Sequence, residues 1–340
     1  MKKVLSLIVA FVLVVVLLFA YKFFGPGTNF NDSKKYLYIY TGKSSKQDVM
    51  SAIKDSSYLK NTSLFEFAAT KLKVWQRLRP GRYEIAKGSS LFSLIRKLRN
   101  GSQTPVNFVI TKLRTKKDFA ALAGRKFESD SALFINYISN NDTLKKFGLD
   151  TNTVMTAVFP NTYSILWNSS PSKIFSRLNE QRKKFWTNER KQKARALGFT
   201  PEQVYALASI VEEETLQDDE KSIIASVYIN RLKKGMYLGA DPTVKFAVGD
   251  FSLKRILFGH INSTASSPYN TYKNKGIPPG PICTPSEKTI DAVLNPAKTN
   301  YLFFCAKANS NGHHAFAATD TEHAQNAKNY QQWLDSMNIK

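Results

Sequence analysis

The sequence predicts an α+β protein with an N-terminal transmembrane helix, a small α/β module and a larger mixed α+β domain. Three observations predict this organisation. The chain opens with a long apolar run, residues 36–110 alternate short strand and helix patterns, and helical periodicity dominates the rest until a loop-rich C-terminal part. With 340 residues and 43% hydrophobic content, the chain is long enough to bury two sizeable cores.

The N-terminal segment has the features of a membrane anchor. Residues 4–20 are apolar apart from Ser6, and the aromatic residues Tyr21, Phe23 and Phe24 follow them. This run is about as long as a bilayer is thick, and aromatic side chains favour the membrane–water interface. A cleaved signal peptide is the alternative, but bulky side chains stand where cleavage requires small ones. We therefore expect residues 1–24 to be an uncleaved anchor.

The charge pattern predicts which side of the membrane the body occupies. Lys2 and Lys3 favour a cytoplasmic N-terminus, although Lys22 at the other end weakens the asymmetry. The sequence thus predicts a single-pass protein of the cell (inner) membrane with an extracytoplasmic body. In that compartment the net charge of +23 would not serve nucleic acid binding. A polyanionic envelope or the anionic membrane surface is the favoured partner, and a diffuse field without a partner is equally open.

The residue types that hold metals, nucleotides or acyl groups form no recognisable motif. The four histidines make no HExxH arrangement, and the chain has neither a glycine-rich phosphate loop nor a GxSxG elbow. No metal and no cofactor is therefore expected. Cys283 and Cys305 could pair outside the cytoplasm or remain buried thiols, and the sequence leaves both possibilities open.

The small module is predicted at 36–108, after a polar linker at 25–35 that opens with Gly25-Pro26-Gly27. Its elements follow from strand alternation, helix caps and turn residues. They are a strand at 36–40, a helix from 45 to about 53, a strand at 79–85, a helix at 89–98 and a strand at 106–110.

The larger domain is predicted at 109–340. Its first part is helical from 115 to 149, followed by a turn-like break at 159–163 and a long basic helix at 171–197. Helices at 200–214 and 221–232 come next. Dense turn chemistry then predicts loops at 241–243, 267–272 and 276–280. The chain closes with an apolar strand at 301–306 and a helix that carries Tyr330 and Trp333.

The helix at 200–214 ends in three consecutive glutamates. Thr200 is a plausible N-cap, Pro201 fits the first helical position, and Gln203 completes a capping box. An apolar stripe then recurs at helical spacing, at Val204, Leu207, Ala208 and Val211.

The helical period places the three glutamates differently around that stripe. Glu213 falls opposite it and is expected to face water, whereas Glu212 and Glu214 fall on its two flanks. A carboxyl group at the edge of an apolar surface can have a raised pKa, as a general acid requires. A solvated glutamate face is the ordinary alternative for such a run.

Several short strings follow one another from this helix to the end of the loop-rich part. They are Ala-Ser-Ile-Val-Glu at 208–212, Ser-Val-Tyr-Ile-Asn-Arg-Leu at 226–232, Gly-Met-Tyr-Leu at 235–238, Asp-Pro-Thr-Val at 241–244, Pro-Tyr-Asn-Thr-Tyr at 268–272, Gly-Ile-Pro-Pro-Gly-Pro-Ile at 276–282 and the late His314-x-Phe316. In this order they resemble the MltG/YceG family of membrane-anchored endolytic murein transglycosylases.

The chain also departs from the family pattern. The family's Phe-Pro-Asp-Thr-Tyr string appears as Phe-Pro-Asn-Thr-Tyr at 159–163, and Met155-Thr156 replace an expected Glu-Gly pair. Gly239 stands where a glutamine is common. No family role is therefore carried over to the 155–163 loop.

The resemblance implies that the 36–108 module is LysM-like and that Glu212 is the essential acid. Enzymes of this class cut the MurNAc–GlcNAc bond of peptidoglycan, and the 6-hydroxyl of the muramic acid attacks its own anomeric carbon to leave a 1,6-anhydro end. Glu212 would first act as general acid and then as general base. Because the substrate supplies the nucleophile, one carboxyl group can serve both steps.

Polar residues of the loop-rich part are the candidates for substrate binding. They are Asp241, Thr243, Asn270, Tyr272 and His314. For each, a buried hydrogen bond that only holds its loop is the alternative.

Two other functions remain open from the sequence. A muramidase that uses water would need a second carboxylate, for which Asp241 is the candidate. A glycan-binding scaffold would recruit cell-wall synthesis proteins and would not need Glu212 for its function.

Overall fold

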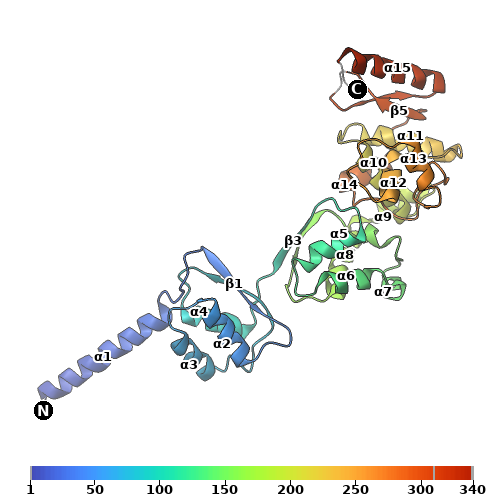
Figure 1. Cartoon of the computed structure of the whole chain (residues 1–340). Coiled ribbons are helices and arrows are strands. Elements are labelled where there is room, and N and C mark those ends of the chain that lie inside the picture. The colour runs from blue at the N-terminus through green and yellow to red at the C-terminus, as the bar shows by residue number, and fades with distance from the viewer. Residues whose placement is uncertain (1, 309–310, 338–340) are drawn as a thin grey trace. The chain divides into compact units, whose positions relative to one another are not determined.

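The computed structural model describes residues 2–308 and 311–337. It is a mixed α+β chain, with one apolar helix at the N-terminus (Figure 1). The chain forms two compact units. The first contains the chain up to Phe108 together with 124–130 and 164–170, and the second contains the remainder. The sequence analysis had assigned neither of the two short segments to the small module.

Helix α1 (Lys2–Phe24) is long and apolar enough to span a membrane, and none of its residues is buried. After it, the segment predicted as a linker is hydrogen bonded to the rest of the first unit. The backbone N–H of Gly27 donates to Ser89 (3.0 Å), and that of Asn29 donates to Tyr58 (2.9 Å). These bonds satisfy polar backbone groups that would otherwise need water.

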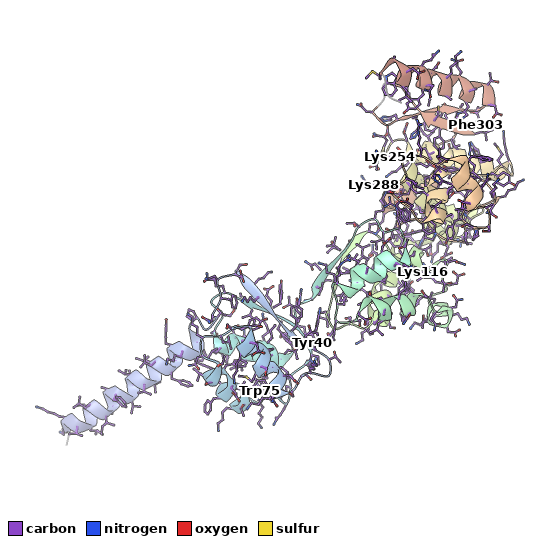
Figure 2. All side chains as sticks on the ribbon, viewed as in Figure 1. Tyr40, Trp75, Lys116, Lys254, Lys288 and Phe303 are labelled. Atoms are coloured by element: carbon purple, nitrogen blue, oxygen red, sulfur yellow. The ribbon has the colours of Figure 1, made fainter. Side chains whose placement is uncertain are left out.

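The first unit is built on an antiparallel strand pair, β1 (Lys34–Ile39) and β2 (Gly81–Ala86). Helices α2 (Lys46–Asp55), α3 (Thr62–Lys71) and α4 (Leu91–Asn100) complete it, of which α3 was not predicted. Every second residue of the strands and the apolar face of each helix contribute to one core. This follows from the geometry, because side chains alternate between the two faces of a strand and recur about every 3.6 residues around a helix. Its fully buried members include Leu37, Ile53, Phe65, Tyr83 and Ile95. Trp75, labelled in Figure 2, donates its indole N–H to Thr70.

The second unit is mainly helical. Its strand β5 (Phe303–Ala306) pairs antiparallel with β6 (His314–Ala317). Strands β3 (Val106–Ile110) and β4 (Asn161–Ile165) pair with each other, and neither belongs wholly to one unit. The helices are α5 (Lys116–Gly124), α6 (Ser131–Ile138), α7 (Asn141–Lys145), the 3₁₀ turn η1 (Val154–Ala157), α8 (Pro171–Phe185), α9 (Asn188–Ala196), α10 (Pro201–Glu214), α11 (Lys221–Lys233), α12 (Asp241–Val248), α13 (Phe258–Ser263), α14 (Glu287–Leu294) and α15 (Asp320–Ser336). Phe303 of β5 stacks on His323 of α15 (Figure 2).

Three sequence predictions in this unit were wrong. The break predicted at 159–163 contains the start of β4. The long basic helix is two helices, because the hydroxyl of Thr187 accepts a hydrogen bond from the Arg190 N–H and caps a new helix there. The stretch 241–243, predicted as a loop, is the first turn of α12, in which proline occupies a position that needs no N–H donor.

Helix α10 lies at the centre of the second unit's core. Its predicted capping box is confirmed: Thr200 accepts from the N–H of Gln203, and Gln203 accepts from the N–H of Thr200. All eight residues at 204–211 are buried, not only the predicted stripe, because α9, α11, α12, α14 and η1 all pack against this helix. The three glutamates therefore emerge at the C-terminal end of a helix that is covered on every side.

Candidate functional site

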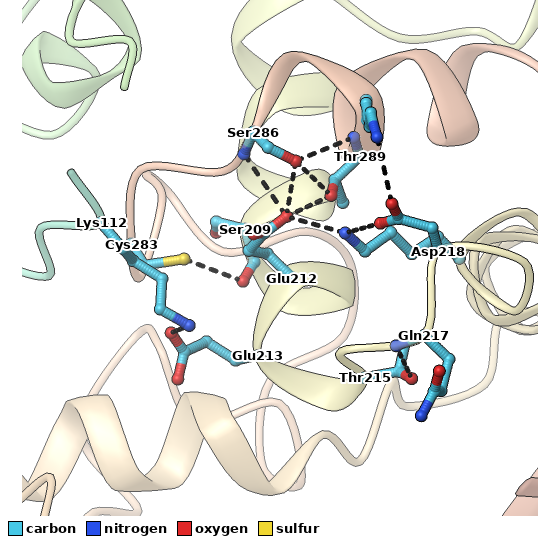
Figure 3. Close-up of polar contacts among 12 residues, drawn as sticks. Lys112, Ser209, Glu212, Glu213, Thr215, Gln217, Asp218, Cys283, Ser286 and Thr289 are labelled. Atoms are coloured by element: carbon cyan, nitrogen blue, oxygen red, sulfur yellow. Dashed lines mark hydrogen bonds and ion pairs between the residues drawn. The ribbon is translucent and has the colours of Figure 1, made fainter. Parts of the chain in front are cut away.

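Glu212 is held by the N-terminal end of α14 (Figure 3). Its Oε2 accepts hydrogen bonds from the hydroxyl of Ser286 (3.1 Å), from the backbone N–H of Ser286 (3.4 Å) and from the hydroxyl of Thr289. Ser286 is also the N-cap of α14, so the same side chain fixes the helix and the carboxyl group. The Glu212 side chain is 17% exposed, so it is mostly covered but open to one side.

Lys221 supplies a buried positive charge next to Glu212. Its Nζ lies 3.6 Å from Glu212 Oε2 and 2.7 Å from Asp218 Oδ1, and its side chain is only 8% exposed. A buried ammonium requires such partners, since leaving it unpaired would cost several kcal/mol. Glu212 therefore sits between hydroxyl donors on one side and a cation on the other, which is a preorganised setting for charge that changes during a reaction.

The sequence analysis did not single out Ser286, Thr289 or Lys221. The pattern Ser286-Glu287 before an apolar run is a helix-start signal, so α14 itself was within reach of sequence reasoning. Its contact with Glu212 was not, because about 75 residues separate the two segments in the chain.

The prediction that Glu213 faces water was wrong. Its side chain is 12% exposed and pairs with Lys112 Nζ (2.9 Å) and with Arg114 (3.0 Å). Burial raises the pKa of Glu213, but the two cations outweigh burial and hold the pKa below its usual range. The helical period located the apolar stripe correctly. It could not show that the 112–114 segment covers the opposite side.

The carboxyl group whose pKa is raised is that of Glu214. Burial raises it to about 7, and the charge of Asp241 adds to the effect. The hydroxyl of Tyr228, on α11, donates a hydrogen bond to Glu214 Oε1 and partly opposes the rise. The sequence analysis expected that a glutamate on the flank of the apolar stripe could have a raised pKa, and Glu214 has one.

Two of the candidate substrate-binding residues form a pair. Asp241, at the start of α12, accepts a hydrogen bond of 2.6 Å from the hydroxyl of Tyr272. Thr243 and Asn270 are completely buried, and their side chains hydrogen bond to neighbouring segments of the protein. The hydroxyl of Thr243 donates to Ala240 (2.6 Å) and contacts Thr271 (2.8 Å), and the amide of Asn270 donates to the Ile261 carbonyl (2.8 Å).

His314 lies on β6 and bonds to Glu220. Its Nδ1 is 2.9 Å from Glu220 Oε2, and its backbone N–H donates to Glu220 Oε1 (2.7 Å). Glu220 precedes α11, so this contact joins the β5–β6 hairpin to the helix that carries Lys221 and Tyr228. These bonds support a role for His314 in positioning.

Neither cysteine forms a disulfide. Cys283 is buried and Cys305 is half-buried, and burial raises the pKa of both thiols. Within the described part of the chain, no group of histidine, cysteine, aspartate and glutamate side chains could hold a metal ion.

A cleft of about 590 Å³ lies at the other end of α10. Thr200, Gln203, Pro278 and Pro279 are among its lining residues. It contains none of the predicted site residues. Glu212, at the C-terminal end of the same helix, is instead a partly covered surface site.

The comparison with known families decides the assignment of the chain. A family model described as the YceG-like family matches residues 37–329. The chain belongs to the YceG-like family. The resemblance seen in the motifs at 208–316 is thereby confirmed, and the match includes the whole α10–α14 site.

Curated relatives within the YceG-like family carry one name. The chain is 30% identical over 303 residues to the endolytic murein transglycosylase of Bacillus subtilis (strain 168), covering 84% of this chain and 82% of that protein. It is 24% identical to the endolytic murein transglycosylase of Streptococcus pneumoniae (strain R6), covering 87% of this chain and 58% of that protein. The crystal structure of a putative YceG-like protein from Listeria monocytogenes is also similar, with a TM-score of 0.56 and 25% identity over 87% of this chain and 99% of the other.

Proposed function

We propose that this chain is an endolytic lytic transglycosylase that cleaves the MurNAc–GlcNAc bond of peptidoglycan strands, with Glu212 as its acid and base. The relatives' name supports the substrate and the reaction class. The observation that carries the residue assignment is the set of contacts to Glu212. One carboxyl group is fixed by Ser286 and Thr289 at the end of a fully covered helix and is still open to one side.

The reaction needs two proton transfers at one place. In the first, protonated Glu212 gives its proton to the glycosidic oxygen as the bond to the leaving sugar breaks. In the second, the Glu212 carboxylate accepts the proton of the muramic 6-hydroxyl as that oxygen attacks the anomeric carbon. Water is not consumed, and the carboxyl group ends the cycle protonated as it began. Help of this kind contributes about 10²–10⁴ in rate.

The neighbours of Glu212 have separate tasks in this proposal. Ser286 and Thr289 keep the carboxyl group in one orientation, so that both oxygens of the substrate lie within its reach. Lys221 stabilises the carboxylate that exists between the two transfers.

Of the loop residues, Asp241 and Tyr272 are proposed to contact the glycan. Thr243 and Asn270 act indirectly, because Thr243 ties the start of α12 to Thr271 and Asn270 ties the 267–274 loop to α13, and His314 positions α11 through Glu220.

The products of cleavage test this proposal. Purified, uncrosslinked glycan strands treated with the full-length protein are expected to yield new ends that carry 1,6-anhydro-MurNAc, one water lighter than reducing ends by mass spectrometry. Only reducing ends would contradict the transglycosylase and favour a muramidase with a second carboxylate. Intact strands, with binding retained, would favour a scaffold that recruits cell-wall synthesis proteins.

We further propose that α1 anchors the chain in the cell (inner) membrane, with the two compact units outside the cytoplasm and the LysM-like module at 36–108 contributing glycan contacts. The length and apolar character of α1 support the anchor. The lysines at its start support the orientation. Protease added to intact cells freed of their wall is expected to digest both units and spare α1. Protection of the whole chain would rule out this topology.

A further inference from the structure

Glu214 is a buried carboxyl group that has no task in the reaction above. Its Oε1 accepts the hydrogen bond of Tyr228 from α11, and α10 packs directly against both α11 and α12. At the start of α12, Asp241 accepts the hydrogen bond of Tyr272 from the 267–274 loop. One carboxyl–tyrosine pair thus links α10 to α11, and a second links α12, which also packs on α10, to the 267–274 loop.

Arg231 is the cation near these residues, and two of its nitrogens donate hydrogen bonds to backbone carbonyls. Its Nε donates to the carbonyl of Leu302 (2.6 Å), and one terminal nitrogen donates to the carbonyl of Leu238. Both Arg231 and the Tyr272 ring pack on Gly239. A Cβ at Gly239 would lie 3.4 Å from the Arg231 nitrogen and 3.6 Å from the ring. Arg231 lowers the pKa of Glu214 from its present position, and a closer approach to Glu214 would break these two hydrogen bonds.

We propose that Glu214 is a positioning residue for glycan cleavage: in its neutral form it allows the Asp241–Tyr272 pair to pack against α10, and its ionisation pushes that pair away. The inference rests on the proposed function, because the readout is cleavage at Glu212. In this role Glu214 does not contact the substrate.

Electrostatics gives the direction of the effect. The groups that act on Glu214 are Tyr228 and Arg231 from α11, Asp241 from α12 and Glu213 from its own helix, and Glu214 in turn raises the pKa of Tyr272 in the loop. Both acidic neighbours repel an ionised Glu214. Burial removes the water that would screen this repulsion. Burial of the Glu214 carboxyl group is the main cause of its pKa of about 7, and the repulsion by Asp241 and Glu213 adds to it. This pKa places the change of charge in the working range of an extracytoplasmic enzyme.

The pH dependence of kcat/KM separates a positioning role from a purely structural one. Wild-type full-length protein in detergent micelles is compared with Glu214→Gln from about pH 5 to about pH 9. If both Glu212 and Glu214 must be protonated, log kcat/KM of the wild type falls with a slope approaching about −2 at the alkaline end. The Gln variant, which mimics the neutral acid, is expected to fall with a slope of about −1.

At the acid end of the pH range, kcat/KM of the Gln variant is expected to lie within about fivefold of the wild-type value, because the change perturbs roughly one hydrogen bond. Equal slopes in the two proteins would overturn the proposal.

Two further variants sharpen the test. Tyr228→Phe removes a hydrogen bond that lowers the pKa of Glu214, so the alkaline fall is expected to move to higher pH. Glu213→Gln is the matched control: it makes the same chemical change one residue away, in a group with a lowered pKa, and is expected to leave the wild-type slope unchanged. A flattened slope in Glu213→Gln as well would contradict a role specific to Glu214.

The pH dependence of thermal stability tests the titration of Glu214 without an activity measurement. The pKa of Glu214 is raised from 4.5 to about 7 on folding, so its contribution is fully present below pH 4.5 and is lost as the pH rises to about 7. The Tm of the wild type minus that of Glu214→Gln is therefore expected to fall across this window and to be constant above it. For Glu213→Gln the same difference is expected to be flat. If strands are not cleaved at all, the proposed function fails, and this measurement still decides whether Glu214 titrates as described; a flat difference for Glu214→Gln would overturn the inference.

Discussion

Replacing Glu212 by glutamine is expected to lower kcat/KM on glycan strands by at least about 10²–10⁴-fold, the usual contribution of general acid–base catalysis. The reason is chemical. Glutamine has the size of glutamate, and its amide oxygen can still accept the hydrogen bonds of Ser286 and Thr289. It cannot give a proton to the glycosidic oxygen or take one from the 6-hydroxyl.

The fold of this variant is expected to survive. Lys221 loses one carboxylate partner but keeps Asp218 at 2.7 Å, so its charge is not stranded. The measurements are turnover of purified strands, strand binding by co-sedimentation, and circular dichroism of the variant. Glu213→Gln, measured in parallel, is expected to keep most of its activity. Wild-type turnover by the Glu212 variant, with the fold intact, would remove Glu212 from the mechanism.

Replacing Thr289 by valine is expected to have the second largest effect, about 10²-fold in kcat/KM, as for a misplaced catalytic group. Thr289 is completely buried, and its hydroxyl contacts both Glu212 Oε2 and the hydroxyl of Ser286 (2.9 Å). Valine has nearly the same shape but no donor. It removes one of the three hydrogen bonds that orient the Glu212 carboxyl group and leaves Ser286 without one of its partners.

Thr289→Ser is the matched variant, because serine keeps the hydroxyl and removes only a methyl group. Its kcat/KM is expected to stay within about fivefold of the wild-type value, which corresponds to the roughly 1 kcal/mol that the lost methyl packing contributes. Activity of both variants on strands and their Tm values are compared. If the serine variant loses as much activity as the valine variant at equal stability, packing rather than the hydroxyl holds Glu212, and the proposed role of Thr289 is wrong.

Local signals predicted the elements that carry the site. The capping box of Thr200 and Gln203 and the apolar period located α10 to the residue, because caps and periodicity act within a few residues of the chain. The strands at 36–40 and 106–110, the turn into a strand at 79–85 and the apolar N-terminal helix were also found, with small shifts at their ends. Aspartate, proline and threonine are common both in turns and at the start of helices. At Asp241-Pro242-Thr243 the sequence analysis predicted a loop, and the structure has the first turn of α12.

The sequence by itself determined the apolar N-terminal helix, the helix that bears the three glutamates, and through its motifs the family. Only the tertiary structure decided what each glutamate does: Glu212 meets Ser286, Thr289 and Lys221, Glu213 meets Lys112 and Arg114, and Glu214 meets Tyr228. The physical reason is that the state of a carboxyl group depends on the charges, donors and water within a few ångströms. Those neighbours come from α14, from the 112–114 segment and from α11, and nothing in the local pattern of α10 records which of them will cover which side.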